Sequence, residues 1–313
     1  MNVNRHTAVT PREVRPGSLA AWLVAVRPHS LLVAFSPVLV GATLGFARTG
    51  AIDLVAALLV LGSALLVQVI TNMQNDVGYT VRGGDSSGTR TGLPRATANG
   101  WLSVRHVRTG IVVVALAATA MGLALVAYRG WPVLAIGVAS LLAALAYMGG
   151  PKPIAYTPLG ELTVFVFFGL VAVMGTDWVL TGAIGADSAL AAVAIGALAA
   201  AALAVNNHRD LAHDRLVGRR TFAVTFGERA SLALYSTLLL GPMVLVPAMA
   251  LLAQSPALLL PWLLLPAAVQ LQRDFASCAP GTAFNAILFR TFRLELWFAA
   301  LLTAGALLGR ALR

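Results

Sequence analysis

Long apolar runs recur from one end of this chain to the other, and they constrain its fold more than any other feature. Nine of them are separated by short polar stretches, at 19–46, 52–75, 101–128, 131–149, 159–182, 188–208, 230–252, 255–272 and 292–310. A helix rises about 1.5 Å per residue, so each run can cross a hydrocarbon core of about 30 Å. Because 58% of the residues are hydrophobic and only 11% are charged, the sequence predicts an all-α integral membrane protein with nine transmembrane helices.

The runs also predict the domain organisation. Residues 1–18 form a polar N-terminal tail, and residues 19–313 form a single membrane domain. The first run is too long for the apolar segment of a cleaved signal peptide, so we expect it to remain as a helix. Cys278 is the only cysteine, which excludes a disulfide framework and a cysteine metal cluster.

The basic residues predict an orientation in the membrane. With nine helices, Arg48, Arg129, Arg310 and Arg313 fall on one side, and all other basic residues fall on the opposite side. Basic residues concentrate in cytoplasmic loops, so we expect a cytoplasmic N-terminus in the inner (plasma) membrane. The net charge of +10 is therefore explained by the basic residues of the cytoplasmic loops. Arginines scattered over short loops do not indicate nucleic-acid binding.

Two polar clusters stand at the predicted cytoplasmic ends of helices. The first contains Asn72, Asn75, Asp76 and, further along, Asp85; the second contains Asn206, Asn207, Asp210 and Asp214. The repeated Asn-x-x-x-Asp pattern predicts two related halves, with motifs near 72–95 and 206–220. Residues four apart share a helix face, so both clusters could face one central cavity. Carboxylates are costly near hydrocarbon, which favours a functional reason for keeping them.

Magnesium and a diphosphate would suit these clusters. Mg2+ takes oxygen ligands, commonly one or two carboxylates together with phosphate oxygens. The glycine-rich segment 82–95 and the segment 218–221 both carry arginines that could bind phosphate. Neither has the spacing of a P-loop, so an ATP-driven machine is not supported. The alternative is that the aspartates are ordinary helix-end residues paired with arginines.

Several strings in the chain resemble one family. NNHRDLAHDRLVGRRTFAV at 206–224 is similar to the second aspartate-rich motif of the UbiA superfamily of intramembrane prenyltransferases. TNMQNDVGYTVRGGD at 71–85 resembles the first motif, and WLVAVRPHSLLVAFSPVLVGATLGF at 22–46 and LGELTVFVFFGLVAVMGT at 159–176 resemble the first and fifth helices. The similarity spans about residues 20–310 and is greatest to the 1,4-dihydroxy-2-naphthoate polyprenyltransferase branch.

The resemblance implies a UbiA-like bundle around a central cavity and a magnesium-dependent reaction. A polyprenyl group would pass from an allylic diphosphate to an aromatic acceptor. In that branch the acceptor is 1,4-dihydroxy-2-naphthoate, and its carboxylate leaves as carbon dioxide to give a demethylmenaquinone. The chain departs from the family at Tyr79, where a further aspartate is usual. Whether Asp76 and Asp85 hold the first magnesium alone or with Asn72 or Asn75 therefore stays open.

Site roles follow from this chemistry. A leaving diphosphate is stabilised by metal ions and by basic side chains. The expected metal ligands are Asp76, Asp85, Asp210 and Asp214, and Asp76, Asp210, Asp214 and Lys152 are the expected catalytic residues. The expected substrate-binding residues are Asn72, Asn75, Arg82, Arg95, Tyr156, Asn206, Asn207, His208 and Arg219. For the arginines and for Lys152, the only lysine, positive-inside charge is the alternative.

The sequence gives weaker signals for the residues that bind the aromatic acceptor than for those that bind the diphosphate. An allylic cation must meet a ring before it meets water, and the aromatic residues Tyr156, Phe165, Phe167 and Phe168 could wall such a chamber. Candidates for orienting the acceptor are His208, His213, Glu161 and Asp177. All of these could instead be lipid-facing or packed helix residues, and Glu295 could pair with Arg293 or a nearby arginine.

Other functions stay open at this point. The acceptor could be 4-hydroxybenzoate, homogentisate or a tetrapyrrole, and the sequence fixes neither the prenyl chain length nor the oligomeric state. A membrane transporter is the alternative from another class, because transporters also gather polar residues around a cavity. A transporter would more naturally place its polar residues near the bilayer midplane. These clusters instead stand at helix ends beside basic loops, in a chain expected to contact membrane lipid.

Overall fold

A computed structural model describes residues 14–84, 92–279 and 281–312, and within them every regular element is helical. In chain order the elements are α1 (Leu19–Val26), η1 (Pro28–Ser30), α2 (Leu31–Thr49), α3 (Leu54–Val81), α4 (Val104–Arg129), α5 (Trp131–Met148), η2 (Ile154–Tyr156), α6 (Gly160–Val164), η3 (Phe165–Met174), α7 (Gly175–Thr181), α8 (Ala186–Arg209), α9 (Leu211–Leu216), α10 (Phe222–Leu252), η4 (Pro256–Leu264), α11 (Leu265–Ser277) and α12 (Phe284–Ala311). Asp85, an expected metal ligand, lies outside the described residues.

Eight of the predicted membrane-spanning runs are helices long and apolar enough to cross a bilayer. They are Leu19–Thr49, Leu54–Val81, Val104–Arg129, Trp131–Met148, Gly160–Thr181, Ala186–Arg209, Phe222–Leu252 and Phe284–Ala311. The one remaining predicted run, 255–272, is divided between the 3-10 helix η4 and the α-helix α11. Prolines at 256 and 261 remove backbone donors in the first part of that run. Apolar length alone did not reveal this division.

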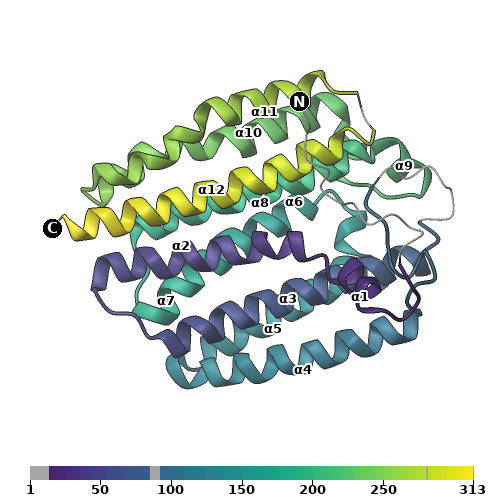
Figure 1. Cartoon of the computed structure of the whole chain (residues 1–313), viewed down its shortest axis with the longest axis horizontal. Helices are drawn as coiled ribbons and strands as arrows, with labels where there is room; N and C mark the ends of the chain where they lie inside the picture. The colour runs from purple at the N-terminus through teal and green to yellow at the C-terminus, as the bar shows by residue number, and fades with distance from the viewer. Residues whose placement is uncertain (1–13, 85–91, 280, 313) are drawn as a thin grey trace.

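The long helices lie alongside one another in one bundle (Figure 1). α10, α11 and α12 form one side, α3, α4 and α5 form the other, and α2 and α8 lie between them. α8 packs on α10, η3, α12 and α2, and its run of buried alanines lets these neighbours approach closely. α1 and α9 lie at one end of the bundle, and the chain ends at the opposite end.

The segment η3 is a ten-residue π-helix. This helix type, with hydrogen bonds between residues five apart, is rare and often marks a functional site. It contacts α8 backbone to backbone through two glycines. A Cβ on Gly169 would meet the carbonyl oxygen of Ala192 and would lie 2.7 Å from the Cα of Gly196. A Cβ on Gly196 would lie 2.6 Å from the carbonyl oxygen of Phe165. Only glycine at both positions therefore allows η3 to lie this close to α8.

An ionic cluster joins α2, α7 and α8 at the end of the bundle opposite α9 (Figure 1). Arg48 contacts Asp177 at 2.6 Å and Asp187 at 3.5 Å. The second oxygen of Asp177 accepts a hydrogen bond from the backbone of Gly185 at 3.0 Å. Asp177 is fully buried, and both its oxygens are engaged there. Asp177 therefore has a packing role at the end of the bundle opposite α9, whereas the sequence suggested that it orients the acceptor.

We expect Gly169→Ala to lower the free energy of unfolding by roughly 1–3 kcal/mol, because the added methyl group overpacks the contact between η3 and α8. The measurement is thermal unfolding in detergent, followed by tryptophan fluorescence. Gly175→Ala is the matched control, since no heavy atom beyond its chain neighbours and its own helix backbone lies within 4 Å of its Cβ position. Equal melting temperatures for the two variants would mean that the close contact is not needed.

Candidate active site

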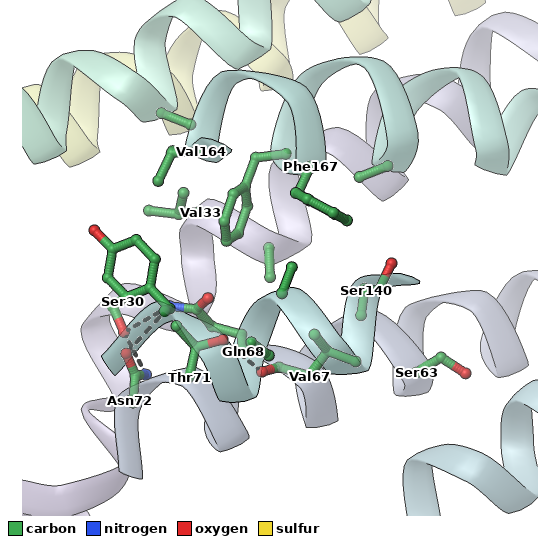
Figure 2. Close-up of a pocket in the computed structure, with 18 of the residues that line it drawn as sticks. Ser30, Val33, Ser63, Val67, Gln68, Thr71, Asn72, Ser140, Val164 and Phe167 are labelled. Atoms are coloured by element: carbon green, nitrogen blue, oxygen red, sulfur yellow. Dashed lines mark hydrogen bonds between the residues drawn. The ribbon is translucent and has the colours of Figure 1, made fainter. Parts of the chain in front are cut away.

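A cavity of about 790 Å³ opens between α2, α3, α5, α8, α12 and the segment from α6 to η3. Figure 2 shows Ser30, Gln68 and Asn72 grouped at one side of it, with Val164 and Phe167 on the opposite wall. The polar residues that line it include Arg27, His29, Ser30, Gln68, Asn72, Asn75, Asn206 and Arg209. The rest of the lining is mostly apolar. The cavity therefore has a polar end and a hydrophobic interior.

Asn72 of the first cluster ties α3 to the junction between α1 and α2. Its Nδ2 donates to the carbonyl oxygen of Val26 and to Oγ of Ser30, both at 2.7 Å. Its Oδ1 accepts from Nε2 of Gln68 at 3.2 Å, and Figure 2 shows this network on the cavity wall. Asn75 also lines the cavity. Both asparagines predicted from the first motif thus reach the candidate site.

Asp76 is fully buried just behind this wall. Its Oδ2 accepts a hydrogen bond from the backbone of Ala96 at 2.8 Å, and its Oδ1 accepts from the backbone and the hydroxyl of Thr97 at 2.8 and 2.5 Å. These bonds hold the loop before α4 against the end of α3. In the described residues Asp76 therefore anchors a loop, and its metal-binding role stays a prediction.

The second cluster forms at the turn between α8 and α9. Arg209 donates two hydrogen bonds to Asp210, at 2.8 and 2.7 Å, and a third to Oδ1 of Asn285 at 2.8 Å. Asp214 is fully buried, and its Oδ1 pairs with Arg219 at 2.6 Å. Burial raises the pKa of the Asp214 carboxyl, and the charge of Arg219 opposes this shift. The arginine pairing that the alternative interpretation expected is thus present for both aspartates.

This arrangement fits a magnesium ion bound together with a substrate. No group of three or more acidic, histidine or cysteine side chains that could hold a metal occurs in the described part of the chain. Mg2+ commonly takes only one or two carboxylates, with the rest from waters and phosphate oxygens. Oδ2 of Asp214 is buried without a hydrogen-bond partner among the described residues. Asp210 stands four residues earlier, so the two could share an ion.

The predicted basic residues gather at the same end of the molecule. Arg82 donates to the carbonyl oxygens of Met148 and Gly150 at 2.7 and 2.5 Å. Arg219 donates to the carbonyl oxygen of Ala155 at 3.1 and 3.0 Å. The guanidinium carbons of Arg82 and Arg219 each lie 5.7 Å from the ring centre of Tyr156. The loop 149–156 is therefore attached to both motifs.

Three other predicted residues are absent from the cavity lining. Lys152 is exposed in the loop after α5. Nδ1 of His208 lies 3.1 Å from Oγ of Ser231, and its ring packs on Phe275 and Phe284, away from the cavity lining. His213 is buried in α9.

The remaining acceptor-side candidates divide between the cavity and the protein interior. Phe167 and Phe168 line the cavity, whereas Phe165 is absent from its lining. Asn207 donates to Oε1 of Glu161 at 2.9 Å. Glu295 is buried, and neither of its oxygens has a hydrogen-bond partner among the described residues, so the alternative of a pair with Arg293 or a nearby arginine is not observed there.

The polar residues of the lining that sequence reasoning missed include Arg27, His29, Ser30, Gln68 and Arg209. Gln68 stands four residues before Asn72, so helical periodicity could have found it. Arg27 has a left-handed backbone conformation, with φ 55°, which no sequence pattern announces. Arg209 was counted only as positive-inside charge.

Comparison with known proteins identifies the family of this chain. The model of the UbiA prenyltransferase family matches residues 34–292. A 1,4-dihydroxy-2-naphthoate octaprenyltransferase of Escherichia coli is 34% identical over 232 residues, which are 72% of this chain and 74% of the relative. The protein of that name from Bacillus subtilis is 29% identical over 289 residues, 90% of each chain.

Solved structures share the fold. A UbiA homolog from Archaeoglobus fulgidus bound to DMAPP and Mg2+ superposes with a TM-score of 0.64 at 18% identity, over 91% of this chain and 99% of that one. The apo structure of a UbiA homolog from Aeropyrum pernix K1 gives a TM-score of 0.65 at 16% identity, over 89% and 97%. The family model and the relative from Escherichia coli confirm the sequence resemblance, and the chain belongs to the UbiA prenyltransferase family.

Proposed function

We propose that this protein transfers a polyprenyl group from an allylic diphosphate to 1,4-dihydroxy-2-naphthoate. The observation that carries the proposal is one cavity with a polar, arginine-bearing end and an apolar interior. Such a chamber suits a substrate with a charged head and a greasy tail. The curated relatives named above support the choice of naphthoate as acceptor.

The charged end accounts for departure of the diphosphate. Breaking the allylic C–O bond leaves negative charge on the departing group, which preorganised positive charge stabilises. Arg209 lines the cavity, and Arg219 is buried beside Asp214. We infer that Asp210 and Asp214, with Asp76 and Asp85 of the first motif, are the ligands of Mg2+. When bound, this ion supplies further positive charge against the leaving group.

The apolar interior accounts for the second half of the reaction. The new bond forms between the allylic carbon and the ring carbon that carries the carboxylate. That carboxylate leaves as carbon dioxide, its bonding electrons restore the aromatic ring, and the product is the reduced form of demethylmenaquinone. Phe167 and Phe168 in the lining keep water from the cation before the ring meets it.

We also propose that the chain crosses the inner membrane nine times with its N-terminus in the cytoplasm. η4 and α11 follow one another directly and together span about 37 Å at about 2.0 and 1.5 Å per residue. That length suffices for a ninth crossing. An odd number of crossings also agrees with α1 and the end of α12 lying at opposite ends of the bundle (Figure 1). The distribution of basic residues supports an active site that opens to the cytoplasm.

We expect purified protein in liposomes to transfer a labelled polyprenyl group to dihydroxynaphthoate only when magnesium is present. Asp214→Asn should lower kcat roughly 100-fold or more, because it removes charge from the buried end of the site. Asp187→Asn is the matched control. It makes the same change at the far end, in a partly exposed pair with Arg48 at 3.5 Å, and should alter kcat less than about twofold.

Different outcomes discriminate the alternatives. Product from 4-hydroxybenzoate, homogentisate or a tetrapyrrole, with none from dihydroxynaphthoate, would contradict the choice of acceptor and keep the reaction type. No transfer to any ring by folded protein would contradict the enzyme and favour a transporter.

The proposed topology predicts which loops a membrane-impermeant thiol reagent can reach. In a Cys278→Ser background, Lys152→Cys should be labelled in inside-out membrane vesicles and protected in intact spheroplasts. Ala183→Cys should show the reverse, since it is exposed in the loop between α7 and α8. Labelling of both positions from the same side would rule out this topology.

A further inference from the structure

His29 belongs to η1, the short turn between α1 and α2, and its exposed side chain lines the cavity. Its ring meets the ring of Phe289 in α12 edge to face, with 5.9 Å between the two centres. The centre of Phe289 lies 6.5 Å from that of Phe292, and both phenylalanines also line the cavity. An imidazole therefore stands beside two aromatic rings on the wall of the cavity, where an aromatic acceptor could pack.

The polar end of the cavity is close to this histidine. Oγ of Ser30, the next residue of η1, accepts a hydrogen bond from Asn72 at 2.7 Å. Arg209 donates to Asn285 at 2.8 Å, one turn of α12 before the phenylalanine that the histidine contacts. Asn72 and Arg209 both line the cavity. An acceptor beside the histidine would therefore lie next to the end that we assign to the diphosphate.

The nitrogens of the His29 ring are available to a ligand. Among the described residues the contact of this ring is with Phe289, and no hydrogen bond or ion pair of the ring occurs there. The two histidines that the sequence suggested for the acceptor are placed differently. Nδ1 of His208 lies 3.1 Å from the hydroxyl of Ser231, and neither His208 nor His213 lines the cavity.

His29 also differs from the other titratable side chains of the lining. Those are Arg27, Tyr147 and Arg209, and no aspartate or glutamate occurs in the lining formed by the described residues. Arginine and tyrosine hold their protons at neutral pH. Histidine can both take up and release a proton in that range. In this lining, His29 is therefore the side chain suited to move a proton to and from a substrate.

The proposed reaction needs such a group. A ring carbon attacks more readily when the neighbouring hydroxyl loses its proton, because the electrons of the O–H bond then pass into the ring. In dihydroxynaphthoate one hydroxyl stands next to the carbon that carries the carboxylate. Arginines cannot accept its proton, and water is to be kept from the allylic cation.

We propose that His29 is the catalytic base and acid of the acceptor, which takes the proton of this hydroxyl and later returns it. As the proton leaves, the ring carbon bonds to the allylic carbon, and the diphosphate departs with the electrons of the C–O bond. The resulting β-keto carboxylate loses carbon dioxide. The electrons of the broken C–C bond restore the ring and leave an oxyanion, which takes the proton back from His29.

The inference rests on the proposed function, and the test is prenyl transfer by the purified full chain in liposomes with magnesium. His29→Gln keeps a polar side chain that cannot take up a proton, so kcat should fall roughly 100-fold or more. KM for the allylic diphosphate should stay within about twofold of the wild type, because the lost step follows binding. Thermal unfolding establishes that the variant is folded, and His29→Asn replaces it in the same assay if it is not.

His106→Gln is the matched control. It makes the same change at an exposed histidine near the start of α4, outside the cavity lining. Its kcat should equal that of the wild type.

A more acidic acceptor separates proton transfer from packing. Dihydroxynaphthoate with fluorine atoms on its second ring loses its hydroxyl proton more readily and depends less on a base. The ratio of wild-type kcat to His29→Gln kcat should therefore be smaller for this acceptor, by roughly fivefold or more. An equal ratio for both acceptors would show that His29 only shapes the cavity, which contradicts the inference.

The remaining outcomes are also decisive. Wild-type kcat in folded His29→Gln would overturn the inference alone, since the active wild type upholds the proposed function. A loss seen only as a higher KM for the allylic diphosphate would assign His29 to the diphosphate and would likewise overturn it. A folded wild type that transfers to no ring would overturn the proposed function and this inference together.

Discussion

The cost of placing charge beside hydrocarbon governs this structure. A carboxylate near the bilayer interior is tolerated only where another group compensates it. Asp76 receives its compensation from backbone amides and a hydroxyl, whereas Asp210 and Asp214 receive theirs from arginines. These contacts fix the loops that follow α3 and α8, and those loops carry the remaining basic residues of the site. The geometry of the polar end thus follows from how each aspartate is paired.

Much of the fold follows from apolar length, because a helix that crosses a bilayer must satisfy its own backbone. This rule predicted the eight long helices, but it did not reveal that the run 255–272 is divided between the 3-10 helix η4 and the α-helix α11. It also could not predict the π-helix η3. Gly169 of that segment packs against Gly196 of α8. A contact between residues this far apart in the sequence leaves no local pattern.

The candidate site was predictable to the extent that its residues follow helical spacing. Asn72, Asn75 and Asn206 were expected at the cavity and line it, because each lies at the polar end of a long apolar helix. Asn207 and His208 come next in the chain, and helical rotation turns them toward Glu161 and Ser231 instead. Arg27 and His29 come from a break between helices. Such residues depend on tertiary contacts that spacing does not encode.

The two halves of the site are therefore related in sequence but different in electrostatics. Among the described residues, Asp76 accepts hydrogen bonds from backbone amides and a hydroxyl, which are neutral donors. Asp210 is neutralised by Arg209, and Asp214 is paired with Arg219 and keeps one oxygen without a partner among the described residues. The first half of the site therefore holds its carboxylate with neutral donors, whereas the second half holds its carboxylates with arginines.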